Sequence, residues 1–257
     1  MFFDTHAHYN DEKFDIDRDN IIKEVYKNDI TRIVCASYNL ESSKMAIQLS
    51  EKYDYIYATC GISPNDIEST GTDFKQAISE IEELSKHSKV VAIGEIGLDY
   101  YWNKENKERQ KEIFIKQIEL ANRVNKPIVI HTRDCISDMI DILKNKIEVK
   151  QKGVFHCCPF NIELVKEAVR LGFYISFSGT VTFKNANPIQ VLNEVPIDKI
   201  VVETDCPYLA PEPFRGKRND SKNIKLIVEK IAEIKQVNVR EIAKIVYENS
   251  NKLFGIF

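Results

Sequence analysis

Imidazole and carboxylate side chains recur in this sequence where runs of β-type residues end. Four of the five histidines lie at such points, and only His87, in a polar stretch, does not. The candidate ligands at these points are His6, His8, Glu95, His131, His156 and Asp205. Imidazoles and carboxylates bind zinc, manganese and similar divalent ions, and the six cysteines contain no CxxC pair that would suggest a thiolate site. The sequence therefore predicts a metal centre built from several strand ends.

The first candidate ligands belong to the run Asp4-Thr5-His6-Ala7-His8. Alternate residues of a strand point to the same side, so Asp4, His6 and His8 share a face and the two imidazoles can bind one ion. Taken alone, the pair fits a hydrogen-bonded pair of strand histidines equally well. The further candidate ligands at other strand ends favour the metal site. We expect Asp4 to support the ligand side chains without binding the metal itself.

Two carboxylates are the candidate catalytic groups. Glu95 lies between Gly94 and Gly97, which permit close backbone approach, and a carboxylate there can bridge two ions. Two ions would lower the pKa of a shared water toward about 7. Asp205 can bind metal through one oxygen and accept the water proton with the other, although it also fits a turn or capping aspartate. Glu203 is expected to orient a ligand histidine, with a structural ion pair as the alternative.

Cations near these positions are candidate substrate contacts. Arg133 follows His131 by two residues and can hold a phosphate or carboxylate, or form a salt bridge at the rim. Arg215, Lys217 and Arg218 form the strongest local anion site, although such runs are often solvated surface. The aromatic run Tyr100–Trp102 can stack on bases, but packing is its favoured role.

The elements that must position these residues alternate along the chain. Eight short apolar runs are typical of strands: Phe2–Asp4, Arg32–Ala36, Tyr55–Cys60, Val90–Ile93, Ile128–His131, Gly153–His156, Tyr174–Phe177 and Lys199–Glu203. Helical spacing occurs over Asp17–Tyr26, Ser42–Lys52, Asp73–Ser85, Glu105–Val124, Asp134–Lys144, Ile162–Leu171, Ser221–Lys235 and Val239–Lys252, with a short further helix between Pro188 and Pro196.

This alternation predicts an α/β protein with a (β/α)8 TIM barrel, and a distorted seven-stranded barrel is the alternative. In such barrels the chemistry lies at the carboxyl ends of the strands, so the metal site is expected there. The length of 257 residues favours one domain over residues 1–257.

Composition limits the function classes. The net charge of -3 gives no general basic field, so nucleic acid would have to meet a local cluster of cations. The six cysteines are expected to be free thiols. The sequence shows no secretory leader and no apolar stretch of about 18 residues, which predicts a cytoplasmic protein that does not enter the membrane.

The sequence also resembles the TatD family of metal-dependent deoxyribonucleases, within the amidohydrolase-like barrels. The motifs that carry the resemblance are Asp4-Thr5-His6-Ala7-His8, Gly94-Glu95-Ile96-Gly97-Leu98-Asp99, Arg109-Gln110 with Phe114, Pro127 through His131 with Arg133, His156-Cys157, Ser178-Gly179 with Thr182-Phe183-Lys184, Glu203 through Leu209, and Arg215 through Asn219. They run from end to end of the chain in the family's order. One departure is Ser63, where many members carry a histidine.

The resemblance implies a hydrolase with two divalent ions, such as Mg, Mn or Zn, bound by the six candidate ligands. It further implies action on DNA phosphodiesters, often as a 3′–5′ exonuclease, with single strands or 3′ ends as substrate and no obligate protein partner. A second hypothesis keeps the metal site but assigns it a different bond to hydrolyse, so that the protein would be an ester or amide hydrolase or a D-aminoacyl-tRNA deacylase. A binding module with a vestigial site is the third, and the complete ligand set argues against it.

Overall fold

The structure is a computed structural model that describes residues 1–70 and 74–257. It divides into two compact units, which we treat one at a time. Unit 1 comprises Met1–Cys35 and His156–Phe257, and unit 2 comprises Ala36–Phe155. Asp73, the expected first residue of one helix, falls outside the described residues. The expectation of one domain stays a prediction.

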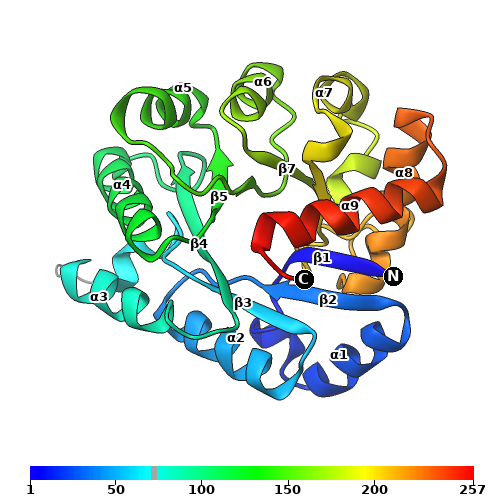
Figure 1. Cartoon of the computed structure of the whole chain (residues 1–257), viewed down its shortest axis with the longest axis horizontal. Helices are drawn as coiled ribbons and strands as arrows, with labels where there is room; N and C mark the ends of the chain where they lie inside the picture. Colours follow the sequence, from blue (N-terminus) through cyan, green and yellow to red (C-terminus); the bar gives the residue numbers. More distant parts are fainter. Residues whose placement is uncertain (71–73) are drawn as a thin grey trace. The chain divides into compact units, whose positions relative to one another are not determined.

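Eight strands follow one another in the order β1 to β8, with helical segments between them (Figure 1). The paired strands within each unit run parallel. This confirms the (β/α)8 class that the sequence predicts, with eight strands rather than the alternative seven.

Unit 1 contains four strands and five α-helices. The strands are β1 (Phe2–Ala7), β2 (Ile30–Cys35), β7 (Tyr174–Phe177) and β8 (Ile200–Val202), and the helices are α1 (Arg18–Lys27), α6 (Ile162–Arg170), α7 (Pro188–Glu194), α8 (Ile224–Lys235) and α9 (Val239–Phe254). Helix α9 lies across β1, where the Phe3 ring is 6.0 Å from that of Phe254 and 6.1 Å from that of Tyr247 (Figure 1). The short helix expected between the two prolines is α7.

Backbone hydrogen bonds connect the ends of β1 and β8 within this unit. The Asp205 N–H donates to the His6 carbonyl at 2.9 Å, and the His8 N–H donates to the Cys206 carbonyl at 2.7 Å. Because these bonds alternate along two neighbouring segments, they set the register between the HxH run and the segment after β8. They place three candidate ligands next to one another.

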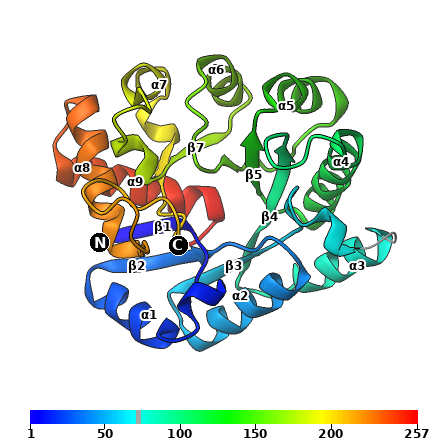
Figure 2. The same cartoon turned by 180° about the vertical axis from the view of Figure 1, so that it is seen from behind.

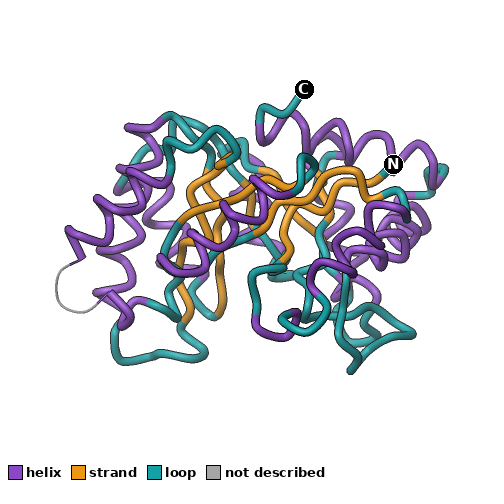
Figure 3. The backbone as a smooth tube through the Cα atoms, turned by 90° about the horizontal axis from the view of Figure 1, so that it is seen from below, coloured by secondary structure: helices purple, strands orange, loops and turns teal. Residues whose placement is uncertain are grey.

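Unit 2 contains the other four strands. They are β3 (Ile56–Cys60), β4 (Val90–Asp99), β5 (Ile128–Arg133) and β6 (Val154–Phe155), and the helices are α2 (Leu40–Lys52), α3 (Phe74–Leu84), α4 (Lys107–Val124) and α5 (Ile136–Asp141), which a π-helical turn extends over Ile142–Lys146. Helices α3 and α4 lie beside each other (Figure 2). In each unit the helices flank the strands, as the colouring of Figure 3 shows.

Helix α4 buries the apolar face that its spacing predicts, including Phe114 and Ile118. It also buries two glutamines that the pattern did not single out. The side chain of Gln117 bonds the N–H and the carbonyl of Ile62, at 2.8 and 2.9 Å. Gln110 does the same for the N–H and carbonyl of Asp99, at 2.8 and 3.0 Å. Buried amide side chains therefore satisfy backbone groups of Ile62 and Asp99.

Strand β4 differs from its expected extent. The sequence ended it at Ile93 and placed Glu95 after it, whereas the strand continues to Asp99, so Glu95 lies inside it. Pairing with β5 shifts register between Ile93 and Ile96 and then continues to Asp99 opposite Arg133. A shift of this kind absorbs extra residues and re-aims a side chain, which is why the strand continues through the ligand.

Gly97 explains how β4 and β5 approach so closely. Its φ of +148° is available to glycine, and a Cβ there would lie 2.0 Å from the His131 carbonyl oxygen. Gly216 also has positive φ, at +84°, but a Cβ there would meet nothing within 4 Å.

We predict that Gly97→Ala lowers the free energy of unfolding by at least about 2 kcal/mol, because it adds a clash to backbone strain. Gly216→Ala, which adds strain alone, should cost about 1 kcal/mol. Urea unfolding of both variants measures the difference. Equal losses would show that the approach of β4 to β5 does not require glycine.

Candidate metal centre

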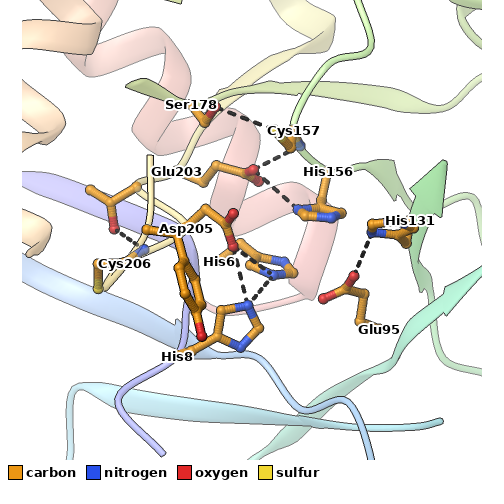
Figure 4. A network of polar contacts seen from close by, with 12 residues as sticks. His6, His8, Glu95, His131, His156, Cys157, Ser178, Glu203, Asp205 and Cys206 are labelled. Carbon is orange, nitrogen blue, oxygen red and sulfur yellow. Dashed lines mark hydrogen bonds and ion pairs between the residues drawn. The ribbon is translucent and has the colours of Figure 1, made fainter. Parts of the chain in front are cut away.

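Three candidate ligands of unit 1 meet at the ends of β1 and β8 (Figure 4). The His8 Nε2 lies 3.1 Å from the His6 Nε2 and 3.1 Å from the Asp205 Oδ1. The distance from the His6 Nε2 to the Asp205 Oδ1 is 3.6 Å. The side chains of His6 and His8 are 1% and 8% exposed, and that of Asp205 is 14% exposed. The cluster is therefore buried, with its carboxylate nearest to solvent.

The donor set fits a divalent cation. Ligands held about 2.1 Å from a tetrahedral ion lie about 3.4 Å from one another, close to the three distances seen here. Two imidazole nitrogens facing each other can share only one hydrogen bond, whereas one cation satisfies both together with the carboxylate. Burial raises the pKa of Asp205, but the hydrogen bond to His8 and the nearby imidazoles outweigh it, so the net pKa lies below its usual value. The carboxylate is thus available as an anionic ligand.

Asp205 follows the last strand, which the sequence predicted to end at Glu203. Strand β8 ends at Val202, and Asp205 adopts a left-handed φ of 54° in the following turn. The Asn219 amide holds this turn by donating to the carbonyls of Thr204 and Tyr208, at 2.9 and 2.7 Å. The turn, rather than strand alternation, aims the carboxylate at His8.

A second group of unit 1 contains His6, His156 and Glu203, with ligand atoms all within 4.8 Å of one another. The His156 ring stacks on His6 at 4.1 Å between centroids. The Glu203 Oε1 accepts the N–H of Cys157 at 2.7 Å and lies 3.3 Å from the His156 Nδ1 (Figure 4). This is the contact that the expected orienting role requires, and the role itself stays a prediction.

Glu203 is fully buried, and its Oε2 has no hydrogen-bond partner among the residues that the structure describes. A buried carboxylate oxygen without a partner is costly unless a cation or proton meets it. The partnerless oxygen of Glu203 is thus a second reason to expect a cation beside the buried histidines of unit 1.

Asp4 supports the turn rather than the imidazole rings. Its Oδ1 accepts the Thr204 N–H at 2.9 Å, and its Oδ2 accepts the hydroxyls of Thr204 and Ser221 at 2.5 and 2.6 Å. Burial raises the pKa of Asp4 to about 7 although these hydrogen bonds oppose the rise. Ser221 lies far along the sequence, and no spacing signal identified it.

In unit 2, His131 lies between two carboxylates. Its Nδ1 is 2.7 Å from the Glu95 Oε1, and its Nε2 is 2.9 Å from the Asp99 Oδ2. The Glu95 N–H donates to the Ser37 carbonyl at 2.6 Å, which fixes the backbone at the bridging candidate. Asp99 was not among the predicted site residues, yet a carboxylate behind a histidine is the usual support of a metal ligand. That Glu95 and His131 bind the same ions as the candidate ligands of unit 1 stays a prediction.

The four candidate substrate cations have different surroundings. The Arg133 guanidinium lies 3.8 Å from the Tyr101 ring centroid. Arg215 lies 4.4 Å from that of Phe183, and Lys217 lies 5.7 Å from that of Phe214. Their substrate roles stay predictions.

Arg218 instead forms a two-pronged ion pair with Asp17, at 2.8 and 2.6 Å. This pair raises the pKa of Arg218 and lowers that of Asp17. Any contact of Arg218 with substrate would have to compete with this ion pair.

We predict that Asp4→Ala lowers the free energy of unfolding by about 3 kcal/mol, because it leaves buried donors of Thr204 and Ser221 unpaired. Asp4→Asn keeps an acceptor and the shape of the side chain, so it should cost less. Urea unfolding in the presence of a chelator separates this effect from metal binding. Wild-type stability of Asp4→Ala would contradict the supporting role.

The expected free thiols are confirmed, since all six cysteines are unbridged. Along the described ranges, 1–70 and 74–257, we find no helix with the length and apolarity to cross a membrane.

Comparison with known proteins agrees with this chemistry. A family model described as "TatD related DNase" matches residues 3–255. The chain is 45% identical to the uncharacterized metal-dependent hydrolase YabD of Bacillus subtilis, and the match covers all of both chains. It is 35% identical to the uncharacterized metal-dependent hydrolase YcfH of Escherichia coli, and that match covers 98% of this chain and 95% of YcfH. The crystal structure of YjjV, a TatD homologue from Escherichia coli K12, superposes with a TM-score of 0.92 at 25% identity, covering 100% and 98% of the two chains. Because the family model covers residues 3–255 and YabD is 45% identical over the whole chain, the chain belongs to the TatD family and is a metal-dependent hydrolase.

Proposed function

We propose that the protein is a divalent-metal-dependent deoxyribonuclease that removes nucleotides from the 3′ end of DNA. The observation that carries the proposal is the buried cluster of His6 Nε2, His8 Nε2 and Asp205 Oδ1, with separations of 3.1 to 3.6 Å. The description of the matching family model supports the choice of DNA.

A divalent ion held by this cluster supplies Lewis acidity and lowers the pKa of a bound water. Asp205 is the proposed general base. Its side chain is 14% exposed against 1% for His6, so within unit 1 it is the ligand best placed to meet water. Its net lowered pKa keeps it ionised at neutral pH and therefore able to accept a proton.

The proposal includes two ions, of which Mg, Mn or Zn are the candidates. His131 and His156 complete the proposed ligand set, and Glu95 has the bridging role. Each histidine lies beside a buried carboxylate, His131 at 2.9 Å from Asp99 and His156 at 3.3 Å from Glu203. Such support fixes the ring and strengthens a ligand.

Arg133, Arg215 and Lys217 are the proposed phosphate contacts. Arg133 and Arg215 each lie against an aromatic ring, which limits their motion while leaving the guanidinium donors able to bond. Arg218 is proposed as a weaker contact because Asp17 holds it. The proposed location of the protein is the cytoplasm.

We predict that chelation abolishes digestion of 3′-labelled DNA and that Mg, Mn or Zn restores it. Asp205→Asn should lower the restored rate at least about 100-fold, because it removes both a ligand charge and the base. Asp198→Asn makes the same change at an exposed position of unit 1 and should leave the rate unchanged. Single-stranded and duplex substrates with free or blocked 3′ ends show whether an end is required.

The same activated water can attack a carbonyl carbon, so the assay includes a carboxylic ester and a D-aminoacyl-tRNA. If the ester or the D-aminoacyl-tRNA is hydrolysed and none of the metals supports cleavage of DNA, the deoxyribonuclease activity is overturned. The assignment as a metal-dependent hydrolase would then remain.

A further inference from the structure

The segment after β4 presents two aromatic rings to solvent. Trp102 is 69% exposed and Tyr101 is 48% exposed, and their rings meet edge to face with centroids 4.9 Å apart. Tyr100 is different, because it is buried and its hydroxyl donates to Asp138 at 2.6 Å. The packing role that the sequence favoured for the whole run therefore holds for Tyr100 alone. Adjacent exposed aromatic rings are typical of binding surfaces.

A buried carboxylate holds the backbone that carries both rings. The Asp99 Oδ1 accepts the N–H of Tyr101 at 2.9 Å and the N–H of Trp102 at 3.1 Å. The other oxygen of the same carboxylate lies 2.9 Å from the His131 Nε2. Gln110 in turn bonds the Asp99 backbone on both sides. The backbone of Tyr101 and Trp102 is thus anchored to the carboxylate that contacts a proposed metal ligand, within one unit.

A cation completes the surface. Arg133, which pairs with Asp99 in the β4–β5 register, places its guanidinium 3.8 Å from the Tyr101 centroid and 5.5 Å from the Trp102 centroid. Arg133 is exposed. Neighbouring aromatic rings and a guanidinium match the two parts of a nucleotide, because a base stacks on the rings while a phosphate meets the cation.

From this arrangement we propose that Tyr101 and Trp102 form a stacking platform for single-stranded DNA, in which a base stacks on one ring and meets the edge of the other, with Arg133 on an adjoining phosphate. The inference rests on the proposed function, since it assigns the surface that holds the DNA substrate. Stacking accepts any base, so the platform gives affinity for unpaired strands without reading sequence.

The chain offers a direct signal for stacking, because Trp102 is its only tryptophan. Titrating chelator-treated protein with a short single-stranded oligodeoxynucleotide should quench the tryptophan fluorescence in a saturable way. An abasic oligomer of equal length carries the same phosphates and should quench little. Binding is measured without metal, so no cleavage is needed for the result.

Variants test the contribution to affinity. Trp102→Ala and Tyr101→Ala should each raise the dissociation constant for labelled single-stranded DNA at least about fivefold, measured by fluorescence anisotropy. Trp102→Phe keeps a ring and should stay within about twofold of the parent protein. Tyr26→Ala, on α1, removes a tyrosine that is also 48% exposed and should change nothing.

With metal restored, the Trp102→Ala defect should appear in KM, with kcat retained, because the platform binds substrate and takes no part in bond cleavage. Equal quenching by the abasic oligomer, or Trp102→Ala with the affinity of Tyr26→Ala, would overturn the platform. If the quenching and the variant effects are observed but no metal supports DNA cleavage, the platform is upheld and the deoxyribonuclease activity is overturned. The two failures are therefore distinguishable.

Discussion

The candidate centre of unit 1 depends on a short backbone ladder between the end of β1 and the turn after β8. Two hydrogen bonds, from Asp205 to His6 and from His8 to Cys206, align segments almost 200 positions apart in the sequence. Side chains on such aligned segments meet without further adjustment, which is how His6, His8 and Asp205 come to surround one point. The ladder is formed from backbone groups, so any ligand set at these positions would inherit the same geometry.

Buried carboxylates also support candidate residues within each unit. Asp4, Asp99 and Glu203 are all fully buried, and each accepts at least one backbone N–H. Asp99 and Glu203 also contact a histidine side chain, while Asp4 secures the turn that carries Asp205. A carboxylate bound to backbone amides cannot rotate freely, so the histidine beside it is held in one orientation.

The sequence predicted much of this arrangement. Short apolar runs rich in Val, Ile, Phe and Tyr identified all eight strands, and the positions of polar residues at their ends located the candidate ligands. It failed where local geometry departs from a regular strand. Glu95 lies inside β4 because a register shift extends the strand, and Asp205 lies in a left-handed turn that alternation cannot describe. Ser221 carried no signal, and Gln110 belonged to a motif of the family resemblance without an assigned role, because the roles of both arise only from contacts formed on folding.

The central claim is that the buried imidazoles and carboxylate of unit 1 hold a divalent ion. Crystals grown with manganese and measured for anomalous scattering test it directly. The account predicts a peak about 2.0 to 2.3 Å from the His6 Nε2, the His8 Nε2 and one Asp205 oxygen, which is lost in His8→Ala. A protein with no peak at these atoms, or with manganese bound only elsewhere, would contradict it.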